Sequence, residues 1–163
     1  MTDFRILLEL LAKGKVEFVI VGGLAATVHG SSRLTQDIDV VYARSDSNLE
    51  RLADSLASIA PYPRGAPPGL PFEWSVATLR RGLNFTLTTA AGYIDLLGEI
   101  TGGGQYEDLL PHTLEIELFG HPCLCLDLEW LIRTKRAAGR PRDFETLAEL
   151  QVLREERDAA SGD

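Results

Sequence analysis

The chain places two aspartates inside an otherwise apolar strand, and this feature restricts its fold more than any other. The segment reads VGGLAATVHGSSRLTQDIDVVY over residues 21–42. Side chains two positions apart in a strand lie on the same face. Asp37 and Asp39 therefore project together, while Ile38 and Val40 point to the opposite side, toward the core. The strand needs one buried apolar face and a second face that is hydrated or holds a positive charge.

Neighbouring carboxylates repel each other, so a pair that stays ionised requires a cation, a basic partner or generous hydration. Mg²⁺ is commonly bound by one or two carboxylates together with substrate phosphates. Asp95 lies in a second apolar strand and is a candidate third carboxylate, which would complete a two-metal site. A simpler interpretation stays open, because an Asp-x-Asp sequence is also common in exposed turns and at strand ends.

The residues before the paired aspartates are suited to a phosphate. Gly22 and Gly23 form a turn between a short strand and a short helix, where backbone N–H groups can face phosphate oxygens. Any tight turn from a strand to a helix could use the same pair. Arg33 and Thr35 lie in the following polar loop and could contact a substrate, although solvation of the loop explains them equally well.

The order of the remaining elements predicts an α/β protein. Hydrophobic spacing and turn residues predict helices over residues 3–13, 24–30, 46–60, 127–139 and 140–158, and strands over 17–21, 37–42, 83–90, 92–100 and the two halves of 113–126. The proline-rich segment 61–71 predicts an irregular surface connection, and residues 159–163 are expected to fray. We expect a single domain over residues 1–163, with a core over about 15–126 and a C-terminal helical segment over 127–158.

Composition limits the partners and the location. The chain has 163 residues with 16 Lys and Arg against 24 Asp and Glu, a formal net charge of −8, which makes nonspecific DNA binding unexpected. The sequence contains neither a basic leader followed by an apolar block nor an apolar run long enough for a bilayer, so we expect a cytoplasmic protein without a membrane segment. The two cysteines, Cys123 and Cys125, are expected to be reduced and packed in a strand.

One segment of this acidic chain is basic. Five cationic residues fall within ten positions, namely Arg133, Lys135, Arg136, Arg140 and Arg142. Such side chains could hold the β- and γ-phosphates of a nucleotide or an acceptor's phosphate, and arginine could do so in a bidentate manner. The alternative is a solvated helix face that answers the C-terminal end of the helix dipole.

Two segments carry a family resemblance. The glycine turn and Asp-x-Asp strand of residues 21–42, together with LDLEWLIRTKRAAGRPRDFETLAEL over residues 126–150, resemble the nucleotidyltransferase superfamily. Within it, they are similar to a small prokaryotic branch related to the nucleotidyltransferase toxins of abortive-infection and toxin–antitoxin systems. The resemblance spans about residues 19–150 and implies an α/β (α+β) nucleotidyltransferase fold, a mixed sheet flanked by helices with C-terminal helices.

The resemblance also implies roles for individual residues. Mg²⁺ or Mn²⁺ would be held by Asp37, Asp39 and Asp95, and these three residues with Lys135 would form the catalytic set. The nucleotide, ATP or another triphosphate, would be bound by residues that include those in the loop and the basic segment: Gly22, Gly23, Arg33, Thr35, Lys135, Arg140, Arg142 and Asp143. For Asp143 a helix N-cap is the alternative role. Gly23 replaces the serine that is commoner in the superfamily and so removes one hydroxyl from the phosphate site.

The resemblance therefore implies a Mg²⁺-dependent nucleotidyltransferase. It would transfer a nucleoside monophosphate from a nucleoside triphosphate to a hydroxyl on a protein, a tRNA end or a small molecule, and release pyrophosphate. An antitoxin or a second copy of the chain could complete the site. Two alternatives belong to other classes: a catalytically silent relative that acts as a binding partner, and a glycosyltransferase that uses Asp-x-Asp to hold a sugar nucleotide. The small size of the chain disfavours the glycosyltransferase.

Overall fold

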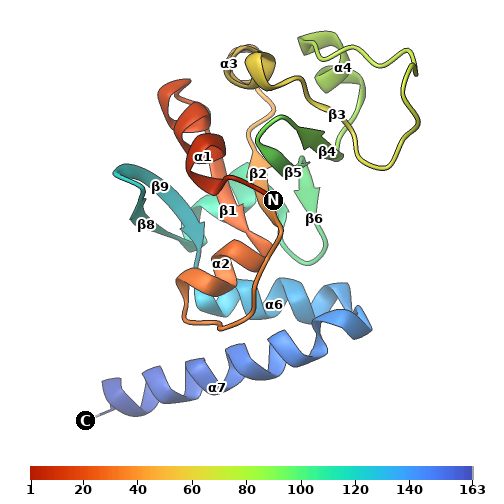
Figure 1. Ribbon diagram of the computed structural model, residues 1–163. Helices are drawn as coiled ribbons and strands as arrows, with labels where there is room; N and C mark the ends of the chain where they lie inside the picture. The colour runs from red at the N-terminus through yellow and green to blue at the C-terminus, as the bar shows by residue number, and fades with distance from the viewer. Residues whose placement is uncertain (163) are drawn as a thin grey trace.

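A seven-stranded mixed sheet runs through the centre of the protein. The computed structural model describes residues 1–162 and gives the strand order β3-β4-β5-β2-β1-β9-β8 (Figure 1). The strands of this sheet are β1 (Phe18–Val21), β2 (Asp37–Tyr42), β3 (Tyr62–Pro63), β4 (Phe85–Thr89), β5 (Gly92–Leu97), β8 (Thr113–Leu118) and β9 (His121–Leu126). A separate small sheet joins β6 (Glu99–Ile100) to β7 (Gly104–Gln105). The predicted α/β class is confirmed.

Helices pack against the sheet and against one another. They are α1 (Phe4–Lys13), α2 (Gly22–Val28), α3 (Asp46–Leu56), α4 (Val76–Arg81), α5 (Tyr106–Leu109), α6 (Leu128–Ala138) and α7 (Phe144–Ser161). Helix α1 contacts α3 and β9, while α2 contacts β1, β2 and α6. Helices α6 and α7 lie side by side, and α7 extends past the rest of the molecule toward the C-terminus (Figure 1).

Side chains in the sequence fix where several helices begin and end. The carboxylate of Asp3 accepts a hydrogen bond from the backbone N–H of Ile6 at the start of α1, and Asp127 accepts one from Trp130 at the start of α6. Gly139 ends α6 in the left-handed conformation that glycine adopts most readily. Asp127 is therefore the N-cap of α6.

Strand β2 pairs with a neighbour on each side, and these two pairings fix which residues lie next to its aspartates. β2 pairs with β1 in an antiparallel manner, so that Val21 lies opposite Asp39. β2 pairs with β5 in parallel, so that Asp39 lies opposite Asp95. Ile38 and Val40 are fully buried, as the alternation predicts. Apolar burial on that face fixes the register, because a slip by one residue would bury the aspartates instead.

Several elements differ from the sequence-based expectation. Helix α4, strands β3 and β7 and helix α5 were not predicted, since each is too short to show a period in the sequence, and the strand predicted over residues 92–100 is divided into β5 and β6. Helix α2 begins at Gly22, so the glycine pair forms its first turn and does not precede it. Helix α7 continues to Ser161, where fraying was expected. The cysteines are free and buried, as predicted.

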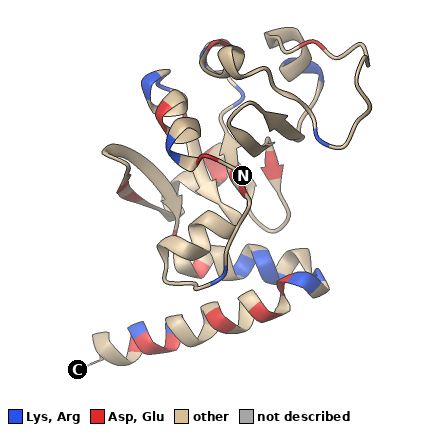
Figure 2. Ribbon diagram, in the orientation of Figure 1, with Lys and Arg blue, Asp and Glu red and all other residues tan. Residues whose placement is uncertain are grey.

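Charge is unevenly distributed between the two C-terminal helices. Lysine and arginine gather on α6 and on the turn that leads into α7, whereas acidic residues follow one another along α7 (Figure 2). The basic segment thus lies close to the sheet, on the helix that contacts α2. Across residues 1–162, every helix is too short or too polar to cross a bilayer.

Candidate active site

Three carboxylates from the two central parallel strands converge on one face of the sheet. Asp37 and Asp39 come from β2, and the register of the parallel pair brings Asp95 of β5 beside Asp39. One carboxylate oxygen from each residue lies within 4.8 Å of the other two. The structure therefore brings together the three aspartates that the sequence singles out.

The surroundings of these aspartates favour different protonation states. Burial raises the pKa of Asp39 from 3.8 to about 8, and the negative charges of Asp37 and Asp95 add to the shift. Burial also raises the pKa of Asp95, although the positive charge of Arg64 opposes the shift. Without a metal, Asp39 therefore keeps a proton at neutral pH.

The acid cluster has the donor set that a divalent cation requires. Oδ1 of Asp39 is buried and has no hydrogen-bond partner among residues 1–162. A buried polar atom without a partner is costly, and a cation bound between the three carboxylates would satisfy it. Carboxylate oxygens are also the preferred protein ligands of Mg²⁺. Asp37, Asp39 and Asp95 therefore fit a Mg²⁺ or Mn²⁺ ion.

The glycine pair allows the first turn of α2 to approach the cluster. A Cβ atom on Gly22 would lie 2.1 Å from Oδ2 of Asp39, and the φ of +65° at this position also favours glycine. A Cβ atom on Gly23 would lie 2.7 Å from Oγ1 of Thr35. That hydroxyl donates to Asp37, either to its backbone oxygen at 3.1 Å or to its Oδ1 at 3.2 Å. Thr35 therefore orients a member of the cluster.

Arg64 is a part of the cluster that the sequence did not indicate as a site residue. Its Nη2 donates to Oδ1 of Asp95 at 2.8 Å, and its Nη1 lies 3.5 Å from Oδ2 of Asp37. The guanidinium also lies over the ring of Tyr93, 4.4 Å from its centroid. The available signal was that Arg64 is the one charged residue in the proline-rich segment 61–71.

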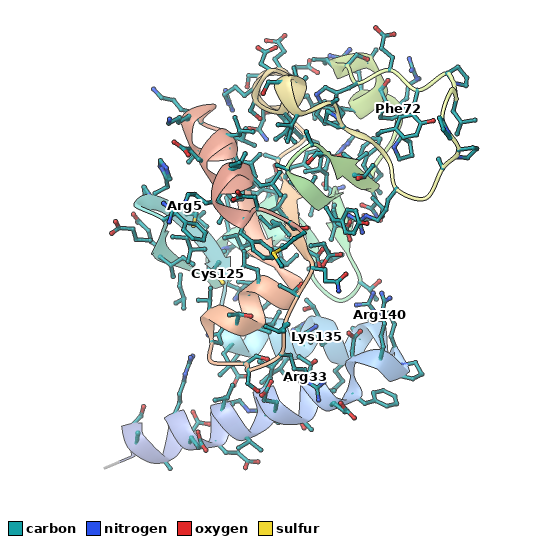
Figure 3. The ribbon with its side chains drawn as sticks, in the orientation of Figure 1. Arg5, Arg33, Phe72, Cys125, Lys135 and Arg140 are labelled. Carbon is teal, nitrogen blue, oxygen red and sulfur yellow. The ribbon has the colours of Figure 1, made fainter. Side chains whose placement is uncertain are left out.

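A basic wall faces the aspartates from the C-terminal segment. Lys135 is 9% exposed, and its Nζ lies 3.8 Å from Oδ1 of Asp143. Nε of Arg140 donates to the other oxygen of Asp143 at 2.6 Å. Asp143 makes no side-chain capping bond at the start of α7, so it serves as the partner of two cations and does not cap the helix. In Figure 3, Lys135 lies on α6 and Arg140 at the turn into α7.

A cavity of about 500 Å³ separates the acids from the basic wall. Its lining includes Gly22, Asp39, Asp95, Lys135, Arg140 and Arg142. The positive charge of Lys135 also lowers the pKa of Asp39, although burial and the neighbouring acids outweigh this effect. Most of the residues that the sequence predicts for the site thus surround one space, with negative charge on the sheet side and positive charge on the helix side.

Five of the predicted residues are absent from the cavity lining, namely Gly23, Arg33, Thr35, Asp37 and Asp143. Arg33 forms an ion pair with Glu145 of α7 and is not part of the cavity lining. Figure 3 shows it between the loop before β2 and α7. Gly23 faces Thr35 and is also absent from the lining. The structure therefore brings Gly22, but not Gly23 or Arg33, into contact with the cavity.

A second hollow of about 610 Å³ adjoins the first. The two share Asn84, Glu99, Ile100 and Thr101 along their common border. The far side of the second hollow is formed by Trp130 and Arg133 of α6, whose guanidinium lies 4.6 Å from the centroid of the indole ring. Two neighbouring spaces are therefore available beside the acid cluster.

Comparison of sequences gives no relative for this chain. No protein-family model matches it, and no curated protein matches it. Its structure, in contrast, is similar to solved structures at low sequence identity. TM1012 from Thermotoga maritima, which is named as a candidate nucleotidyltransferase, has a TM-score of 0.56 and 17% identity, with coverage of 91% of this chain and 94% of that one.

Two further structures have similar folds. The lincosamide antibiotic adenylyltransferase LnuA, solved with lincomycin bound, has a TM-score of 0.60 and 16% identity, over 93% of this chain and 98% of LnuA. An antigenic nucleotidyltransferase-like protein from Paracoccidioides brasiliensis has a TM-score of 0.53 and 15% identity, over 91% of this chain and 72% of that one. The chain therefore has the nucleotidyltransferase fold, as predicted.

Proposed function

We propose that this chain is a metal-dependent nucleotidyltransferase that transfers a nucleoside monophosphate from a nucleoside triphosphate to a hydroxyl group. The observation that carries the proposal is the cluster of Asp37, Asp39 and Asp95, with its unpartnered buried oxygen, at a cavity whose opposite wall is basic. This arrangement matches a metal–triphosphate, because the acids hold the cation and the basic residues face the phosphates.

The residues of the chain have distinct tasks in this reaction. Asp37, Asp39 and Asp95 would hold Mg²⁺ or Mn²⁺, which when bound activates the attacking oxygen and neutralises charge on the phosphates. Lys135, Arg140 and Arg142 bind the β- and γ-phosphates from the other side of the cavity. The lack of a side chain on Gly22 leaves room for the triphosphate next to Asp39.

The transfer is an in-line displacement at the α-phosphorus. The acceptor hydroxyl oxygen forms a bond to this phosphorus, the bond from the phosphorus to the bridging oxygen breaks, and pyrophosphate leaves. Asp95 orients the hydroxyl and accepts its proton. Positioning and charge neutralisation supply most of the catalysis in reactions of this type, which is why a small chain can perform it.

We place the binding site of the acceptor in the second hollow. It borders the first at residues such as Asn84 and Glu99, and the first is lined by Asp39 and Asp95. A small molecule fits the size of this space, and the similarity of the fold to LnuA, an antibiotic adenylyltransferase, supports that choice over a protein or a tRNA end.

The resemblance to toxin–antitoxin nucleotidyltransferases leaves an antitoxin or a second copy of the chain as a partner. We propose a cytoplasmic location, which the free thiols of Cys123 and Cys125 support.

Calorimetric titration with the four nucleoside triphosphates, with and without Mg²⁺, tests the proposed function. We expect Mg²⁺-dependent binding of at least one triphosphate to the wild type and its loss in the double variant Asp37→Asn, Asp39→Asn. The matched control is Asp46→Asn, Asp54→Asn, which removes two exposed aspartates of α3 and leaves the cluster intact. Absence of binding to every triphosphate, or equal binding by both double variants, would contradict the proposal.

A catalytically silent binding protein with the same fold is the second candidate. The observation that favours it is the pairing of Arg64 with Asp37 and Asp95, because an internal cation already neutralises two of the three acids. A silent protein would keep that arginine in place and bind no metal. The behaviour of Arg64 therefore decides between the two candidates.

A further inference from the structure

Arg64 contacts two of the three members of the acid cluster. Its guanidinium reaches Oδ1 of Asp95 and Oδ2 of Asp37, and its Nη2 also donates to the backbone oxygen of Leu87 at 2.8 Å. Asp39 is not reached, and its Oδ1 stays without a partner. The arginine therefore neutralises the charge of two acids. The third, Asp39, keeps an unpartnered oxygen that a bound metal would satisfy.

Arg64 can release the two acids only if its side chain moves, and not by losing its charge. Arginine stays protonated at any pH that a folded protein experiences, so loss of its proton cannot release the acids. Its side chain is 23% exposed, and the ring of Tyr93 lies against the guanidinium. Solvent therefore reaches the ion pair, and Nε of Arg64 is buried without a hydrogen-bond partner among residues 1–162.

The backbone next to Arg64 is joined to the sheet by hydrogen bonds. The N–H of Arg64 donates to the oxygen of Thr86 at 3.0 Å, next to the short pairing of β3 with β4. Gly65 follows with a φ of +77°, and a Cβ atom placed there would have nothing within 4 Å. The irregular segment that comes next bulges away from the sheet (Figure 1). Beyond Gly65 the segment is tied to Tyr62, whose hydroxyl donates to the backbone oxygen of Pro67 and accepts from the N–H of Leu70, so release of the two acids involves the side chain of Arg64 and not this segment.

We propose that Arg64 is a displaceable counter-cation, which occupies the acid cluster of the empty protein and is transferred to the nucleotide phosphates when a metal–nucleotide enters. This inference rests on the proposed function. Asp37 and Asp95 would then hold the metal together with Asp39, and Arg64 would donate to the triphosphate as a new anionic partner. A metal ion alone offers the arginine no such partner, so it must compete with the ion pair.

Coupled binding of metal and nucleotide follows from this exchange. In the wild type, a triphosphate should strengthen metal binding strongly, because it provides the destination for Arg64. By linkage, the metal should strengthen nucleotide binding by the same factor. The arginine would thus favour a metal that arrives with its nucleotide over a free divalent ion.

Measurement of Mn²⁺ binding by electron paramagnetic resonance tests the proposal. Mn²⁺ is titrated into the wild type and into Arg64→Ala, Arg64→Lys and Arg33→Ala, with and without a non-hydrolysable ATP analogue. We expect Arg64→Ala to bind Mn²⁺ alone roughly tenfold more tightly than the wild type, the size expected when one charge-assisted hydrogen bond no longer has to be broken. The gain from the analogue should shrink in the same variant.

The other variants separate the ion pair from simple charge effects. Arg33→Ala removes an equal charge from an exposed pair with Glu145, and its Mn²⁺ affinity should stay within about twofold of the wild type. Arg64→Lys keeps the charge but cannot bridge two carboxylates, so its affinity should lie between those of the wild type and Arg64→Ala. If Arg64→Ala fails to fold, Tyr93→Leu removes the ring beside the guanidinium and should raise Mn²⁺ affinity to a smaller extent.

Three other outcomes would overturn the inference, and each has a different meaning. Equal Mn²⁺ affinity in the wild type and Arg64→Ala would show that the arginine does not compete, while the proposed function would stand. Binding by Arg64→Ala but not by the wild type, even with the analogue, would show a permanent arginine and favour the silent protein. Absence of Mn²⁺ binding in every variant would remove the proposed function itself.

Discussion

Arg64 and Lys135 both lie near the acid cluster, but the protein holds them in different ways. Arg64 follows a two-residue strand, and its side chain is 23% exposed. Lys135 lies in the eleven-residue helix α6, and its side chain is 9% exposed and close to Asp143. One cation is therefore attached to an irregular segment, and the other is built into the packed part of the molecule.

Because of this difference, we expect Lys135 to stay in place when a ligand binds and Arg64 to be displaced. Moving Lys135 would leave a buried acid, Asp143, with one cation fewer, which is unfavourable in a poorly hydrated site. Moving Arg64 exposes two acids that solvent already reaches, since Asp37 and Asp95 have side-chain exposures of 32% and 21%. A fixed cation suits the binding of phosphates, whereas a replaceable one suits the exchange with a metal.

The largest expected effect concerns stability and tests this contrast directly. Lys135→Ala should lower the free energy of unfolding by about 3 kcal/mol, the low end for breaking a buried ion pair, because Arg140 still contacts Asp143. Arg64→Ala should lower it by about 1 kcal/mol or less, as expected for a pair that water reaches. Denaturant unfolding of both variants, without metal, measures the two values.

A double variant serves as the control for the first value. Lys135→Ala combined with Asp143→Ala removes both partners, so it should be less destabilised than the sum of the two single changes predicts. The contrast between the two cations would break down if Arg64→Ala lost as much stability as Lys135→Ala.

The next effect depends on pH and concerns Asp39, the acid of the cluster that Arg64 does not pair with. Its pKa in the folded protein is raised to about 8 from 3.8, so the folded state keeps a proton that the unfolded chain has lost within this range. Stability contributed by the protonated group is therefore present below about pH 4 and is lost as the pH rises toward about 8. The slope is at most about 1.4 kcal/mol per pH unit for one proton.

Asp39→Asn should remove this slope. The amide stays neutral, so the metal-free variant should be more stable than the wild type at pH 8, and the two should approach each other at pH 5. Urea unfolding in the presence of a chelator, from pH 5 to pH 9, measures the difference. Asp54→Asn, an exposed change on α3, is the matched control and should keep the slope of the wild type. Parallel profiles for Asp39→Asn and the wild type would contradict the raised pKa.

The sequence allowed the acid side of the site to be predicted because strand geometry is regular. Alternation in DIDVVY places Asp37 and Asp39 on one face and buries Ile38 and Val40, as the structure confirms. An isolated acid in a second apolar strand, Asp95, indicated the third position. The parallel register that brings it to Asp39 is a tertiary feature, which the sequence pattern did not contain.

The arginine side could not be predicted, because it depends on an irregular segment. Arg64 reaches the acids through the pairing of Tyr62 and Pro63 with β4, and a strand of two residues has no detectable period. Proline excluded a long helix or strand there, but it gave no information on where the segment returns to the sheet. Helix α4, with six residues, was missed for the same reason of length.

The smallest expected effect comes from Arg33, which provides a reference for a cation outside the cavity. The sequence predicts contact with the nucleotide, while the structure pairs this arginine with Glu145 on the surface, with side-chain exposures of 48% and 78%. If that pair is its whole role, Arg33→Ala should lower the free energy of unfolding by roughly 0.5 kcal/mol or less and leave triphosphate affinity unchanged. Arg140→Ala, from the cavity lining, should weaken triphosphate binding under the same conditions. A loss of affinity in Arg33→Ala equal to that in Arg140→Ala would mean that the loop before β2 releases Glu145 and turns toward the nucleotide, so Arg33 would join Arg64 as a second cation that changes partners on binding.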